Sequence, residues 1–102
     1  MAYIVPMRFE WDPEKDHANQ SKHGLSFSEA AELLAGKSEC LEIFDATHSI
    51  DEDRFISIGI IGRGVIVVVW TERDEDLTRI ISARMATPRE QRRYWQYMER
   101  LK

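Results

Sequence analysis

The run from Val65 to Trp70 consists of six consecutive apolar residues without polar alternation. This pattern is typical of a central strand that is covered on both faces. It is also far shorter than the roughly 18 apolar residues that a membrane-spanning helix needs. The sequence therefore predicts a layered domain built around this strand, with no membrane partner.

Two further strand patterns flank the central run. Arg54 to Ile61 precedes it across the short glycine-rich hairpin connection Gly62-Arg63-Gly64. Leu77 to Arg84 follows it across a polar turn at residues 74–76. Shorter strands are expected at residues 8–11 and 40–44.

Capping signals predict three helices. The first begins at Asp12-Pro13 and ends near His23, before Gly24. The second opens with the capping box Ser26 to Glu29 and runs to Gly36, and the third opens with Thr87-Pro88-Arg89-Glu90 and runs to about Leu101. The predicted fold is α+β, with two N-terminal helices and one C-terminal helix packed on a mainly antiparallel sheet of four to five strands.

The length of 102 residues suits one domain. We therefore expect a single domain over residues 1–102, with residues 1–6 as a flexible N-terminal extension and Met7 as an alternative start. Because the chain has one cysteine, Cys40, it forms no internal disulfide, and a reducing cytoplasmic environment suits it.

The net charge of -4 argues at first against a nucleic-acid partner. The charge is unevenly distributed, however, with 4 basic and 12 acidic residues in positions 1–53 and 10 basic and 6 acidic residues in positions 54–102. A local cationic surface therefore remains compatible with RNA binding.

The terminal helix carries the densest group of arginines. Helical geometry places Tyr94, Tyr97, Met98 and Leu101 on one face, and Arg89, Arg92, Arg93, Gln96 and Arg100 on the opposite face. Such a stripe is either a solvated surface or a binding site for phosphate groups, which guanidinium groups recognise well.

Two arginines five residues apart, Arg79 and Arg84, occupy the strand at 77–84. Strand alternation directs them to opposite faces unless the strand bulges between them. Each needs a partner, either a carboxylate such as Glu72 or Asp45, or a phosphate. The face of the neighbouring strand that carries Gly59 has small side chains, which predicts a shallow concavity beside these arginines.

The first helix has little apolar surface, because Ala18 is the one aliphatic residue between Glu14 and His23. It is either solvated or faces a ligand. Lys15, Asn19 and Lys22 lie on one face with His23 nearby, a group that suits a phosphodiester.

The polar loop at 45–53 contains His48 among four acidic residues. Its spacing matches no defined metal-binding loop, so we expect no metal there. A histidine in this position is a candidate acid or base. Nucleotide-binding glycine loops and a serine nucleophile elbow are both absent from the sequence.

Blocks of residues along most of the chain resemble the BrnT family of toxins. They include Phe9-Glu10-Trp11-Asp12, Lys22-His23-Gly24, Arg54-Phe55, Thr71-Glu72-Arg73, Arg79-Ile80-Ile81-Ser82-Ala83-Arg84 and Ala86-Thr87. The resemblance implies a type II toxin with a RelE-like fold, in which helices pack on one side of a curved sheet. Met85 departs from the family, which often has a basic residue after this arginine block.

The resemblance also implies partners. These are an RNA substrate and a cognate BrnA-like antitoxin with a ribbon-helix-helix part, through which alone the toxin would reach operator DNA. The alternative function is a non-catalytic subunit that binds such an antitoxin and assists repression.

We therefore predict an endoribonuclease that needs no metal or other cofactor, since RNA supplies its own 2'-hydroxyl nucleophile. Its cleavage would arrest translation and growth. The predicted catalytic residues are Arg79, Arg84, His23 and His48, with His23 and His48 as base and acid. The predicted RNA phosphate ligands are Lys15, Lys22, Arg54, Arg73, Arg89 and Arg93.

Overall fold

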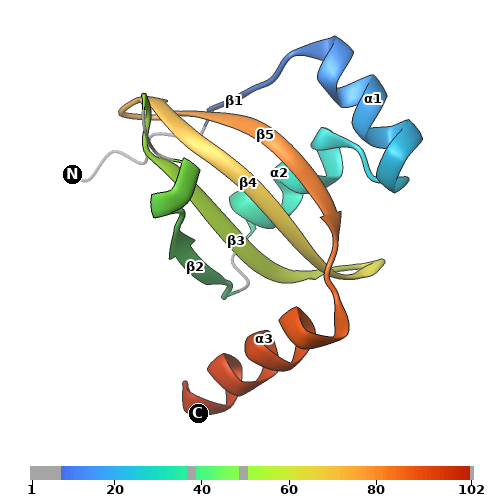
Figure 1. The fold of residues 1–102 in the computed structure, drawn as a ribbon, viewed down its shortest axis with the longest axis vertical. Helices are drawn as coiled ribbons and strands as arrows, with labels where there is room; N and C mark the ends of the chain where they lie inside the picture. Colours follow the sequence, from blue (N-terminus) through green and yellow to red (C-terminus); the bar gives the residue numbers. More distant parts are fainter. Residues whose placement is uncertain (1–7, 37–38, 49–50, 102) are drawn as a thin grey trace, which may run out of the picture.

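The computed structural model describes residues 8–36, 39–48 and 51–101, so the expected extension at residues 1–6 lies outside the described residues. One five-stranded sheet has the order β1-β5-β4-β3-β2 (Figure 1). Its strands are β1 (Arg8–Glu10), β2 (Leu41–Phe44), β3 (Arg54–Ile61), β4 (Gly64–Asp74) and β5 (Leu77–Met85). β1 pairs with β5 in parallel and all other pairs are antiparallel, which confirms the predicted mainly antiparallel sheet.

The three helices begin and end at the residues that the capping signals predicted. They are α1 (Pro13–His23), α2 (Phe27–Ala35) and α3 (Pro88–Arg100), and a short 3-10 helix, η1, spans Ala46–His48. Asp12 caps α1, and Gly24 ends it at a φ of 68°, in the left-handed region that favours glycine. Both predicted capping boxes, at Ser26 and Thr87, are formed.

β4 is covered on both faces, as the apolar run predicted. Ile66, Val68 and Trp70 pack with residues of α2 in the larger core cluster, whereas Val65 and Val67 pack against Tyr94 of α3. Figure 1 shows α3 beside the end of the sheet where β3 and β4 join, away from α1 and α2. The expectation that all helices lie on one side of the sheet is therefore wrong, because each face of β4 carries apolar side chains that need a covering layer.

The small face of β3 is partly filled by α2. A Cβ atom built at Gly59 would lie 2.5 Å from Leu33 Cδ1 and 3.0 Å from Cys40 Cβ, so Leu33 fills the space that the missing side chain leaves. A hollow of about 230 Å³ does lie on this face, with Leu34, Ser57 and Trp70 in its lining. Its predicted place beside the arginines is wrong, because Arg79 and Arg84 lie on the other face of the sheet.

α1 lies along β5 beyond the end of β1. The buried Asn19 side chain donates from Nδ2 to the carbonyl oxygens of Leu25 and Ala83, each at 2.8 Å, and accepts from the Ala83 amide at 3.3 Å. This amide therefore serves the backbone, and the prediction that it faces a phosphodiester is wrong. Within the described residues, no helix has the length and apolar character needed to span a membrane.

Candidate functional site

A bulge in β5 brings Arg79 and Arg84 to the same face of the sheet. Trp70 pairs with Ile80 whereas Val69 pairs with Ser82, so Ile81 is the extra residue. Arg79 then lies opposite Thr71 and Arg84 opposite Val67, two residues of β4 that share one face. That face is the one on which α3 packs, since Val67 contacts the Tyr94 cluster. The condition that the sequence left open, a bulge between the two arginines, is met.

Strands β1, β5, β4 and β3 each contribute one residue to a polar row across this face. In register from β1 to β3, the row contains Glu10, Arg79, Thr71 and Arg54. Arg73 lies two residues beyond Thr71, and its guanidinium contacts the carboxylates of Glu10 and Glu52. We call Arg54, Arg73, Arg79 and Arg84, together with the sheet surface between them, the arginine face.

Carboxylates hold the arginines of this face in place. Glu10 lies 3.3 Å from Arg79 Nη1 and 3.4 Å from Arg73 Nε, both measured to its Oε1. Glu52 lies 3.4 Å from Arg73 Nη1 and 3.7 Å from Arg54 Nη2. The sequence named Glu72 or Asp45 as partners of Arg79 and Arg84, but the ion pairs described for these two arginines are with Glu10 and Glu90.

Arg84 and Glu90 form a two-pronged ion pair between β5 and α3. Nη1 donates to Oε1 at 2.7 Å and Nη2 donates to Oε2 at 2.8 Å. These hydrogen bonds from Arg84 are the main cause that lowers the pKa of Glu90 to about 2. Glu90 also accepts from the Thr87 amide at 2.9 Å, so the capping box of α3 fixes the position of Arg84.

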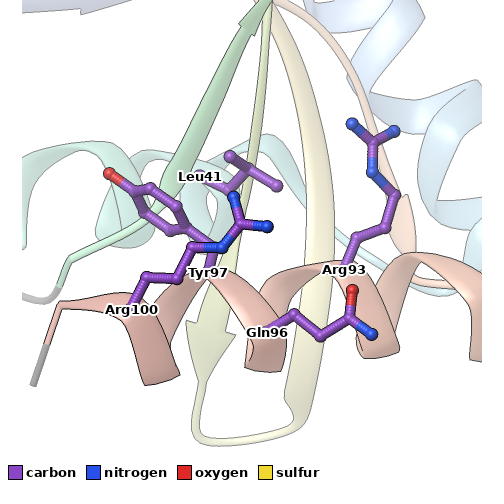
Figure 2. Close-up of a pocket in the computed structure, with 5 residues that line it drawn as sticks. All are labelled: Leu41, Arg93, Gln96, Tyr97 and Arg100. Atoms are coloured by element: carbon purple, nitrogen blue, oxygen red, sulfur yellow. The ribbon is translucent and has the colours of Figure 1, made fainter.

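The arginines of α3 border a hollow beside β2. A space of about 280 Å³ is lined by Leu41, Arg93, Gln96, Tyr97 and Arg100. In Figure 2 these α3 side chains leave the helix on one side, and the Arg93 guanidinium rises along the sheet. Arg89 is exposed on the same helix. The apolar face of α3 is only partly as predicted, because Tyr94 is 3% exposed but Leu101 is 49% exposed.

A second hollow lies between α1 and β5. It has a volume of about 250 Å³, and its lining includes Lys15, Lys22 and His23 of α1 and Ser82 of β5. Ser82 lies between Arg79 and Arg84 in the strand and opposite Val69, on the arginine face. The predicted group of α1 therefore borders the arginine face. Asn19 also lines the hollow, although the polar atoms of its amide pair with the backbone.

The predicted role of His48 in proton transfer stays a prediction. His48 ends η1, and its side chain lies outside the description. Across the ranges that the structure describes, no cluster of three or more His, Cys, Asp and Glu side chains is arranged to hold a metal ion.

The family model for the ribonuclease toxin BrnT of type II toxin-antitoxin systems matches residues 11–90. The chain belongs to the BrnT family. Its structure is similar to the crystal structure of the ribonuclease toxin BrnT of Brucella abortus, with a TM-score of 0.59 and 26% sequence identity. The similarity covers 79% of this chain and 97% of that one. None of the curated proteins matches the chain.

BrnT membership makes this protein a ribonuclease toxin of a type II system, with RNA as its substrate and a cognate antitoxin as its partner. The match includes β3, β4, β5 and α1, which carry most of the arginine face and the α1 hollow. Sequence reasoning missed the carboxylates Glu10, Glu52 and Glu90 as members of the site. Glu10 and Glu90 lay inside recognised family blocks or caps, but only the register shows which arginines they meet.

Proposed function

We propose that this BrnT toxin cleaves RNA without a metal, through attack of the substrate 2'-hydroxyl on the adjacent phosphorus. The observation that carries the proposal is the β5 bulge, which places Arg79 and Arg84 on one face together with Arg54 and Arg73. Permanently charged donors on a rigid sheet stabilise the charge that develops on the phosphorane oxygens.

Arg79 and Arg84 act on the reacting phosphate, since both extend from the same face of β5, on either side of Ser82. Arg54 and Arg73 support the same phosphate or its neighbour from β3 and β4. Lys15 and Lys22 hold the RNA backbone at the α1 hollow. Arg89 and Arg93 of α3 bind flanking phosphates, and the side of α3 shown in Figure 2 supports this for Arg93.

His23 supplies the proton that the 5'-oxygen takes when the phosphorus–oxygen bond breaks. The support is its place in the α1 hollow, which shares Ser82 with the arginine face. His48 stays the second histidine candidate for proton transfer. The products of this reaction are a 2',3'-cyclic phosphate and a 5'-hydroxyl.

The cognate antitoxin is proposed to be BrnA-like, with a ribbon-helix-helix part, and the toxin reaches operator DNA only through it. The support is the type II system to which the family belongs. The toxin is proposed to act in the cytoplasm. Its expression alone should arrest cell growth, and co-expression of the antitoxin should relieve the arrest.

Cleavage of RNA by the purified chain tests the mechanism. We expect Arg79→Ala and Arg84→Ala each to reduce the cleavage rate by about 100-fold or more, which is typical for loss of one transition-state donor. Arg63→Ala is the matched control, because Arg63 is exposed on the β3–β4 turn and pairs with Glu29 of α2 at 3.0 Å. It should retain wild-type activity.

The ends of the products and the effect of EDTA decide the chemistry. Cyclic phosphate ends and full activity in EDTA are expected. Inhibition by EDTA that magnesium reverses, or activity unchanged in both arginine variants, would refute the proposed mechanism.

A further inference from the structure

The proposed reaction needs a group that removes the proton from the 2'-hydroxyl. Among the residues that the structure describes, the carboxylates that contact arginines of the arginine face include Glu10, Glu52 and Glu90. A base must lie within hydrogen-bond reach of the reacting group and keep an oxygen available to accept the proton. The three carboxylates differ in this respect.

Glu90 has no oxygen to offer, because Oε1 and Oε2 both accept from Arg84 at 2.7 and 2.8 Å. Its pKa of about 2, lowered mainly by those hydrogen bonds, also makes it a weak proton acceptor near neutral pH. Glu52 contacts Arg54 through Oε1 and Arg73 through Oε2. Both of its oxygens therefore face guanidinium groups.

Glu10 is engaged through one oxygen. Its contacts with Arg73 and Arg79 are both made to Oε1, at 3.4 and 3.3 Å. Among the residues that the structure describes, no hydrogen bond or ion pair is recorded for Oε2. The side chain is 37% exposed, so solvent and substrate can reach it.

The position of Glu10 is fixed by the backbone. It is the last residue of β1 and the register partner of Arg79 on the arginine face. A phosphate held by Arg79 would therefore bring the sugar attached to it close to this carboxylate. The parallel pairing of a three-residue strand thus places an acceptor oxygen beside a phosphate-binding arginine.

We propose that Glu10 is the general base of the cleavage reaction, an inference that rests on the proposed function. The Glu10 carboxylate takes the proton from the 2'-hydroxyl, and the 2'-oxygen forms a bond to phosphorus. The bond from phosphorus to the 5'-oxygen breaks, and that oxygen takes a proton from His23 or water. Arg73 and Arg79 orient the carboxylate through their contacts with Oε1.

The first experiment compares Glu10→Gln with Asp76→Asn in the full chain. Each variant removes a carboxylate charge that pairs with an arginine, Arg79 for Glu10 and Arg8 for Asp76, and Asp76 lies in the turn between β4 and β5. Glu10→Gln should lower the cleavage rate by about 100-fold or more, as expected for loss of a general base. Its affinity for an RNA that carries 2'-deoxy substitutions at the cleavage site should stay near the wild-type value, and Asp76→Asn should remain active.

The second experiment asks whether an external carboxylate replaces the lost one. In Glu10→Ala, added formate should restore cleavage in proportion to its concentration, a result that a merely structural role would not give. Formate should have no such effect on Arg79→Ala. Because rescue requires folded protein, its appearance also shows that the variant folds.

Several results would overturn the assignment. These are an active Glu10→Gln, a Glu10→Gln that loses RNA affinity as far as it loses activity, and a Glu10→Ala that binds RNA but shows no rescue. If neither variant folds, the wild-type pH–rate profile decides, since an acidic limb near the carboxyl range of about 4 to 5 supports a carboxylate base and one near about 6.5 indicates histidine instead. Absence of cleavage by the wild-type chain would instead refute the proposed function.

Discussion

The side-chain amide of Asn19 pairs with the backbone of Ala83 as a neighbouring strand would. Its Nδ2 donates to the Ala83 carbonyl at 2.8 Å, and its Oδ1 accepts from the Ala83 amide at 3.3 Å. β1 ends at Glu10, opposite Arg79, so none of the strands that the structure describes lies beside the edge of β5 beyond that point. The amide satisfies both backbone groups of a buried residue and ties α1 to the strand that carries Arg79 and Arg84.

Replacement of this amide should destabilise the fold. Asn19→Ala leaves buried backbone groups without partners, so we expect the free energy of unfolding to fall by about 2 to 3 kcal/mol. Ser21→Ala, an exposed position two residues further along α1, should change it by less than about 0.5 kcal/mol. Urea unfolding measures both. Equal stabilities of the two variants would mean that the amide pairing contributes little.

The Arg84–Glu90 pair should make stability depend on pH. The folded-state pKa of Glu90 is about 2, below the ordinary 4.5. The contribution of the pair to the free energy of unfolding is therefore complete above pH 4.5 and is lost as the pH falls through 2. Glu90→Gln keeps a residue that suits the capping box and removes the charge. We expect it to lower the free energy of unfolding by about 1 to 2 kcal/mol at neutral pH, allowing for partial solvent exposure.

Denaturant unfolding of wild type and Glu90→Gln at two pH values checks the sign. The difference between them should shrink by about half near pH 3, midway between the folded and unfolded pKa values of Glu90. A difference that stays constant or grows on acidification would contradict the assignment.

Gly59 and Gly62 form a matched pair of glycine positions on and beside β3. Gly59→Ala brings a methyl group to 2.5 Å from Leu33 Cδ1 and 3.0 Å from Cys40 Cβ, whereas nothing lies within 4 Å of the same group at Gly62. We expect Gly59→Ala to cost about 1 to 2 kcal/mol of stability, because core overpacking forces neighbours to move. Gly62→Ala should be close to neutral. Thermal unfolding compares the two, and equal melting temperatures would show that Leu33 adjusts freely.

Arg93 and Arg92 test which side of α3 meets RNA. Arg93 lines the hollow beside Leu41, whereas Arg92 is exposed one residue, or about 100°, around the helix. Arg93→Ala should weaken binding of single-stranded RNA several-fold and reduce the slope of log affinity against log salt by about 0.7. Arg92→Ala should leave both within error. Similar losses in the two variants would point to a diffuse charge effect.

Local signals in the sequence were sufficient for most of the fold. The cap at Asp12, the capping boxes at Ser26 and Thr87, and Gly24 fixed helix ends within a residue or two, because each satisfies backbone groups of its own segment. The apolar run of β4 indicated burial on both faces. The arginines and lysines of the candidate site were also identifiable by their type and spacing.

Long-range register decided which of those side chains act together. Contacts between residues far apart in the sequence produce the parallel pairing of Glu10 with Arg79 and the packing of Leu33 on Gly59. The bulge at Ile81 arises because β5 has one residue more than β4 between matched pairs. A strand's own alternation fixes its two faces, but it does not show where a partner forces an extra residue out of register. The sequence therefore determined the elements and the chemistry available, and tertiary pairing determined that Arg79, Arg84 and Glu10 share one face.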